Sequence, residues 1–274
     1  MRKHNRRRIR NLVLLIASAL GLAGLYALAQ ASLFATARTS GWLLLGMILF
    51  LAAYNLRKKL PGIPLGSSAA WLQLHIHVGL LTSLVFGLHV SWRLPDGGVE
   101  TALASLYAIV FVSGILGLAL SRSLAKRLTT RGEEVIFERI PIYRKKLAVE
   151  VESMIFQSLG STDSTAIAQF YAERLQPYFA RAHHYWHHLL QSNRPRFALL
   201  GEMKAYHRFL DEDERAVMQD LESRVIAKDN LDYQYSLQAT LKYWLFVHVP
   251  ATYALILFAF FHLLLVSSFT GAAL

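Results

Sequence analysis

The stretch WLQLHIHVGLLTSLVFGLHVSW, residues 71–92, decides the fold class of this chain. It is long and apolar enough to form a helix that crosses a membrane, which requires about 20 such residues. Yet the stretch contains His75, His77 and His89. A polar side chain at membrane depth costs free energy unless it is paired or liganded, so these histidines indicate a functional site.

The composition of the whole chain is that of a membrane protein. Of its 274 residues, 54% are hydrophobic and only 17% are charged, and the apolar residues are too clustered for an ordinary soluble domain. Five segments approach the length of a membrane span: residues 11–31, 41–56, 71–92, 102–121 and 243–268. We therefore expect an all-α membrane protein with about five transmembrane helices in a bundle.

A more polar segment separates the fourth span from the fifth. Its apolar residues recur at spacings of three and four among charged residues, a pattern that predicts amphipathic helices. The sequence thus predicts three parts: an N-terminal transmembrane region at 1–122, a helical cytoplasmic domain at 123–240 and a C-terminal transmembrane helix at 241–274.

The basic residues predict the orientation of the spans. MRKHNRRRIR precedes the first span, NLRKKL follows the second and SRSLAKRLTTR follows the fourth. The positive-inside rule then places the N-terminus in the cytoplasm of a multi-pass protein of the inner (cytoplasmic) membrane. Because the basic residues follow this topology and no groove-reading motif accompanies them, we expect no nucleic acid partner. ALAQA at 27–31 leaves a cleaved signal peptide open as an alternative for the first span.

The chain contains no cysteine. This excludes disulfides, thiolate-ligated iron–sulfur clusters and covalently attached c-type haem. No glycine-rich dinucleotide motif and no P-loop is present either. A redox cofactor in this chain would therefore need other ligands, and histidine is the obvious candidate.

The last span supplies two further histidines, His248 and His262. They lie 262 − 248 = 14 residues apart, the same interval as His75 and His89. Fourteen steps of ~100° end 40° short of four full turns, so each pair faces one side of its helix. His77 points some 120° away from His89 and is not expected to share that face. Both helices are predicted to run outward, so the histidines form two levels ~21 Å apart.

One neutral imidazole from each of two helices, at two separate levels, is what two six-coordinate haems require. His75 is expected to pair with His248 near the cytoplasmic side, and His89 with His262 near the outer side. The alternative is that these are four unrelated polar residues packed against neighbouring helices.

Two glycines lie beside the histidines of the third span. Gly79 is one turn from His75, and Gly87 is two residues before His89. The missing side chains can let a flat macrocycle approach the backbone, so both glycines are candidate cofactor contacts. Glycine also serves plain helix packing, which remains an alternative.

The segments HIHVGLLTSLVFGLH and HVPATYALILFAFFH resemble the ligand helices of the b-type di-haem transmembrane cytochromes, such as the cytochrome b of quinol–cytochrome complexes. The resemblance implies two haem b groups whose irons take His75, His89, His248 and His262 as axial ligands. The chain departs from that family in having five spans, a long insertion between its ligand helices and no recognisable quinol-site motif.

The favoured interpretation is a di-haem b-type cytochrome that transfers electrons across the membrane, between a quinone pool or cytoplasmic donor and a partner redox protein. Such a chain is the electron-transfer subunit of a membrane oxidoreductase complex and has no catalytic residue of its own. Its expected partners are membrane lipid, a c-type cytochrome or iron–sulfur protein, and quinone. The alternative is a non-redox membrane protein, either a metal or proton carrier or a membrane anchor.

A second group of histidines lies in AHHYWHHLL at 182–190. His183 with His187, and His184 with His188, have the one-turn spacing that can chelate a divalent metal. No carboxylate or cysteine follows nearby to complete such a site. The alternative is an aromatic, histidine-rich face at a membrane surface or partner contact.

Overall fold

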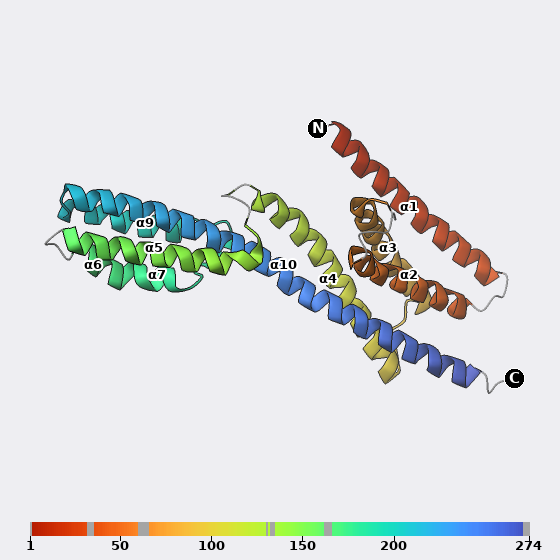
Figure 1. Ribbon diagram of the computed structural model, residues 1–274. Helices are drawn as coiled ribbons and strands as arrows, with labels where there is room; N and C mark the ends of the chain where they lie inside the picture. Colours follow the sequence, from red (N-terminus) through yellow and green to blue (C-terminus); the bar gives the residue numbers. More distant parts are fainter. Residues whose placement is uncertain are drawn as a thin grey trace. The chain divides into compact units, whose positions relative to one another are not determined.

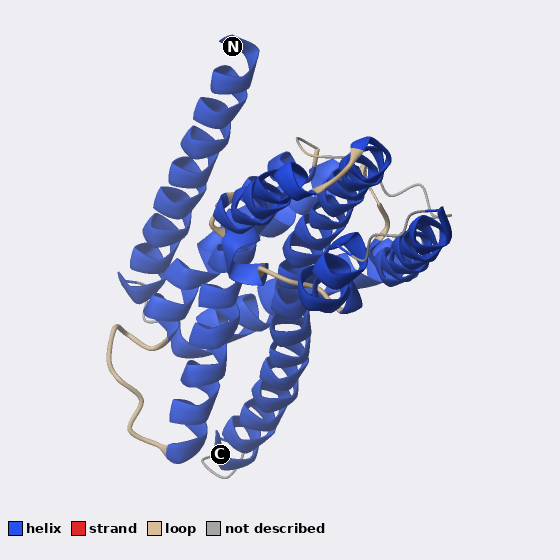
Figure 2. Cartoon of the chain, turned by 90° about the vertical axis from the view of Figure 1, so that its left-hand side faces the viewer, coloured by secondary structure: helices blue, strands red, loops and turns tan. Residues whose placement is uncertain are grey.

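The structure is a computed structural model that describes residues 2–31, 36–59, 66–129, 131, 135–161 and 166–270, with the backbone alone at 2–5, 7, 8, 56–59, 161 and 270. These residues form helices and connecting loops, and no strand occurs among them (Figure 2). The all-α prediction is confirmed. The basic side chains of NLRKKL, and most of those of MRKHNRRRIR, lie outside the described residues.

Among the described residues, five helices are long and apolar enough to cross a membrane, so the chain is a multi-pass membrane protein. In chain order (Figure 1), they are α1 (Arg2–Ala31), α2 (Thr36–Lys59), α3 (Ser68–His89), α4 (Gly98–Leu128) and α10 (Glu212–Thr270).

Helices of 3 to 22 residues fill the segment between α4 and α10. They are η1 (Phe137–Arg139), α5 (Ile140–Ser161), α6 (Ala166–Phe170), the π-helical turn η2 (Tyr171–Leu175), α7 (Gln176–Ala180), α8 (Tyr185–Leu189), α9 (Arg194–Tyr206) and η3 (His207–Phe209).

The chain divides into two compact units. Met1–Leu118 and Leu245–Leu274 form the first, which we call the membrane unit, and Ala119–Trp244 form the second unit. The sequence places the corresponding boundaries at 122/123 and 240/241. α10 is one helix of 59 residues, of which the first part belongs to the second unit and the last part to the membrane unit.

The third span ends earlier than its hydropathy predicts. α3 stops at His89, because Ser91 and Trp92 take left-handed backbone conformations with φ of 52° and 57°. The Trp92 N–H donates to the Gly87 carbonyl at 2.9 Å, closing the helix end. The predicted span 71–92 therefore ends three residues too late, as it also begins three residues after Ser68, and His89 is the last residue of the helix.

The core of the membrane unit joins four of its helices. α2 and α3 pack as an antiparallel pair, since the start of α2 meets the end of α3 at Ser40 and His89, while Tyr54 meets His75. The buried cluster that follows from this packing contains Leu44, Ile48, Val85, Tyr107 and Leu255.

The second unit has its own apolar core, built from α5, α6, η2, α7, α9 and the first part of α10. Among its fully buried side chains are Val151, Leu175, Met203 and Leu221. α10 begins with a reciprocal cap, in which the Glu214 N–H donates to Asp211 and the Asp211 N–H donates to Glu214. The run DEDER at 211–215 thus starts the long helix.

Candidate functional site

His89 is held at Nδ1 by the first turns of α2. The Ala37 carbonyl lies 3.1 Å from Nδ1, and the Ser40 hydroxyl lies 3.2 Å from it. A carbonyl only accepts, so Nδ1 carries the hydrogen and Nε2 carries the lone pair. Gly41 lines the ring closely, because a Cβ there would come within 2.9 Å of the His89 Cε1.

His248 has the same kind of support from α4. Its Nδ1 lies 2.8 Å from the Ser113 hydroxyl, which itself donates to the Val110 carbonyl at 2.9 Å. With that hydrogen used, Ser113 accepts from Nδ1–H, and Nε2 again carries the lone pair. Gly114 lies beside the ring, because a Cβ at this position would be 3.6 Å from the His248 Cε1.

The two supports share one local sequence. Ser40-Gly41 and Ser113-Gly114 are both Ser-Gly dipeptides within membrane helices, and each lies against one histidine. The serine fixes the ring through Nδ1, and the glycine gives the ring room. Metal-ligating histidines are oriented in this way, by a hydrogen bond from the nitrogen that does not bind the metal.

The two ligand helices share one buried cluster. It contains Val85, four residues before His89 on α3, and Leu255, seven residues before His262 on α10. The pairing of His89 with His262 stays a prediction.

A packed layer lies midway between the two histidine levels. Thr82 and Leu255 are each seven residues from both histidines of their own helix, and they are 3% and 2% exposed. The Tyr107 hydroxyl donates to Thr82 at 3.0 Å and its ring belongs to the core cluster. This buried layer thus separates the two predicted histidine levels.

The other candidates on α3 have different neighbours. The His75 ring lies 5.1 Å from that of Tyr54 on α2, while His77 is half-buried. A Cβ on Gly79 would meet Leu51 at 4.0 Å, and one on Gly87 would come within 2.7 Å of the Trp92 indole. The space beside Gly87 thus holds a side chain of this chain, and the pairing of His75 with His248 stays a prediction.

The donor set fits a bis-histidine haem. Neutral imidazoles from two helices, one on each side of the iron, are the axial donors that such a haem takes. α3 carries His75 and His89, and α10 carries His248 and His262. That these four residues ligate haem stays a prediction.

The histidines of AHHYWHHLL do not form the predicted one-turn pairs on a helix. α8 begins only at Tyr185, because His184 is left-handed at φ 60°, and His183 instead bonds the Pro177 carbonyl at 3.0 Å. Burial, then the charges of neighbouring histidines, lowers the pKa of His184. In the part of the chain that the structure describes, no group of three or more His, Asp or Glu side chains is arranged to hold a metal ion.

Sequence reasoning missed the serines and glycines of the second and fourth spans. The signal was present, because Ser-Gly occurs in TSGW at 39–42 and VSGI at 112–115. The sequence does not tell, however, which helix packs against which histidine. No known protein family, curated protein or solved structure matches this chain.

Proposed function

We propose that this chain is a di-haem membrane cytochrome, the electron-transfer subunit of a larger assembly. The observation that carries the proposal is the paired Ser-Gly support, in which Ser40 and Ser113 lie within hydrogen-bond distance of Nδ1 of His89 and His248. Haem iron, when bound, supplies one-electron chemistry in a low-dielectric setting.

The residues divide into ligands and supports. His89 with His262 would hold one haem, and His75 with His248 the other, so each haem takes one nitrogen from α3 and one from α10. Ser40 and Ser113 keep a proton on Nδ1 of their histidines, which fixes the tautomer and raises the basicity of the ligating nitrogen. The buried layer at Thr82 and Leu255 keeps the two sites apart.

The partners follow from the chemistry of such a chain. It would pass electrons across an inner membrane, with its N-terminus and second unit on the cytoplasmic side. A quinone or cytoplasmic donor would supply electrons to the haem at one side of the membrane. A c-type cytochrome or iron–sulfur protein would receive them from the haem at the other side. The apolar spans support lipid contact.

Haem counting on histidine variants tests the proposal. The purified chain should give a reduced-minus-oxidised spectrum with low-spin b-type bands and about two haems by pyridine haemochrome. His89→Ala and His262→Ala should each remove the same haem, and His75→Ala and His248→Ala the other. His77→Ala is the matched control on α3 and should keep both.

Two results would contradict the proposal. A wild-type chain without haem bands would favour the non-redox alternative, a metal or proton carrier or an anchor. Loss of a haem in His77→Ala, with both kept in His75→Ala, would mean that the second site uses a different histidine.

A further inference from the structure

The second unit contains an open pocket of about 480 Å³ that is lined by two guanidinium groups and three carboxamides. Its polar lining residues are Arg131, Arg196, Gln191, Asn193 and Asn230. Tyr233 adds an aromatic wall. The volume falls in the range of small-molecule sites, and the donors are those that recognise oxyanions.

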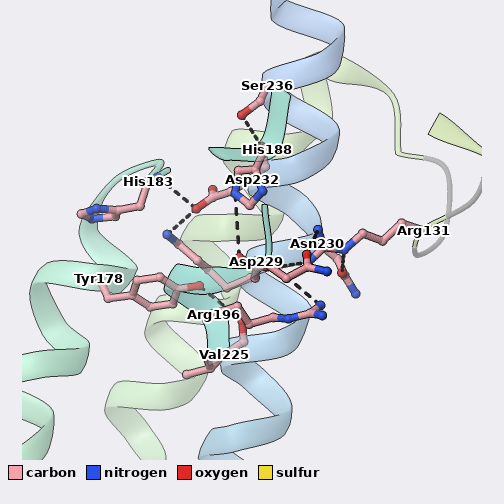
Figure 3. A network of polar contacts seen from close by, with 12 residues as sticks. Arg131, Tyr178, His183, His188, Arg196, Val225, Asp229, Asn230, Asp232 and Ser236 are labelled. Carbon is pink, nitrogen blue, oxygen red and sulfur yellow. Dashed lines mark hydrogen bonds and ion pairs between the residues drawn. The ribbon is translucent and has the colours of Figure 1, made fainter. Parts of the chain in front are cut away.

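Positive charge exceeds negative charge around this pocket. Asp229 is 3% exposed and is the carboxylate on which Arg131, Arg196 and His188 converge, as Figure 3 shows. Burial lowers the pKa of His188 to about 4, so its ring is neutral near pH 7. Two guanidinium groups therefore share one carboxylate.

The neighbouring buried pair adds to the excess. Lys228 is fully buried and donates to Asp232 at 2.5 Å, while Arg144 lies 3.7 Å from the same carboxylate. The whole network thus has four basic side chains, including Arg131 and Arg196, against two carboxylates. Only Lys228 of the four is fully buried, and the three arginine side chains are 17–19% exposed. An excess of partly buried positive charge is costly unless an anion compensates it.

The two pocket arginines have different tasks. Arg131 is anchored, since its three nitrogens donate to Asn230, Asn193 and Asp229. Arg196 lies 3.7 Å from Asp229, and among the described residues its guanidinium makes no hydrogen bond. Arg196 is therefore free to donate to a ligand.

The pocket also lies at the start of α9. Asn193 is the N-cap residue, but its side chain does not cap the helix and instead accepts from Arg131 at 3.4 Å. The first turn of this 13-residue helix contains no acidic residue. Its N–H groups and the positive end of its dipole add to the field of the arginines.

We propose that this pocket binds a phosphate-bearing molecule, with Arg196 as its main side-chain donor. A guanidinium fork matches phosphate oxygens in pairs, and the pocket is larger than a bare phosphate ion, so an organic phosphate fits it better. The phosphate can belong to a soluble metabolite or to a lipid headgroup. This site is independent of the haem proposal and uses none of its residues.

Binding of pyrophosphate to the full-length chain in neutral detergent tests the site. Calorimetric titration at fixed ionic strength should show one saturable site per chain. Arg196→Gln should weaken binding about tenfold or more, because it removes hydrogen bonds to a charged group. Arg224→Gln is the matched control, since Arg224 is also on the second unit but pairs with Glu150, and it should bind like wild type.

Further measurements make the outcome decisive. Arg196→Lys keeps the positive charge but loses the two-pronged guanidinium donor. Its affinity for pyrophosphate should therefore lie between those of wild type and Arg196→Gln. Thermal unfolding checks that each variant folds. Vesicles of phosphatidylcholine with or without phosphatidic acid distinguish a lipid headgroup from a soluble phosphate as the ligand. Vesicle binding that depends on both Arg196 and phosphatidic acid indicates a lipid headgroup. Binding of pyrophosphate without such vesicle binding indicates a soluble ligand. The proposal would be overturned if wild type showed no saturable binding at millimolar pyrophosphate. It would also be overturned if Arg224→Gln lost as much affinity for pyrophosphate as Arg196→Gln.

Discussion

Gly41→Ala is the sharpest probe of the proposed haem site. The new Cβ would lie 2.9 Å from the His89 Cε1, about 0.5 Å inside ordinary contact at 3.4 Å. The ring must move, or α2 and α3 must separate. A shift of about 0.5 Å along the two Nδ1 hydrogen bonds would stretch them from 3.1 and 3.2 Å to about 3.6 and 3.7 Å, beyond hydrogen-bond length.

The size of the effect follows from overpacking. Forcing one methyl group into a packed site costs about 1–3 kcal/mol, which is about 5- to 150-fold in an equilibrium constant. If His89 ligates a haem, that loss falls on the affinity for the haem it shares with His262. We expect Gly41→Ala to retain about one haem per chain after purification, whereas wild type retains two.

The control is Gly46→Ala in the same helix. A Cβ on Gly46 meets nothing within 4 Å, so this variant adds the same methyl group and the same helix propensity without touching a histidine. Pyridine haemochrome on both variants and the rate of haem transfer to an apoprotein acceptor measure the difference. The reasoning fails if Gly41→Ala keeps two tightly held haems, or if Gly46→Ala loses as much haem as Gly41→Ala.

Three further predictions concern other positions. Gly114→Ala should leave the haem of His248 nearly unchanged in a haem count, because its Cβ would make an ordinary 3.6 Å contact; a loss equal to that of Gly41→Ala would contradict the geometry. Ser113→Ala removes the hydrogen bond at His248 Nδ1 and should weaken that haem about 10- to 100-fold, measured by competitive haem transfer; an unchanged transfer rate would count against the support role. Burial lowers the pKa of His188 to about 4 in the folded chain, whereas its pKa in the unfolded chain is near 6.5. The neutral His188 ring therefore contributes its full share of the free energy of unfolding above pH 6.5. That share falls by about 2 kcal/mol as the pH drops towards 4, because only the unfolded chain then takes up the proton. His188→Gln should flatten this part of the pH dependence of thermal unfolding, and an unchanged slope would refute it.

The sequence alone determined the fold class and the candidate ligands. Hydrophobic stretches near 20 residues specify membrane helices without reference to tertiary contacts, because the bilayer itself sets the length. The 14-residue interval of His75 to His89, and of His248 to His262, likewise follows from the helix repeat alone. These features are local in the chain, so a single sequence reveals them.

The end of α3 needed the tertiary structure. Hydropathy extended the span to Trp92, whereas left-handed residues at Ser91 and Trp92 stop the helix at His89. The indole of Trp92 packs into the space that Gly87 leaves open. Hydropathy cannot report this, because it averages over many residues and carries no information about the backbone conformation of a single one.

The supports of the histidines also needed the tertiary structure. Ser40-Gly41 and Ser113-Gly114 lie 49 and 135 residues away from the histidines they bond, counted from the serines, and nothing in the local sequence says which helix faces which. The charge excess at Arg131 and Arg196 is hidden for the same reason, because it arises when distant basic residues are buried around few carboxylates. The chain's local periodicity determined which histidines are candidate ligands, and helix packing decided which side chains orient His89 and His248.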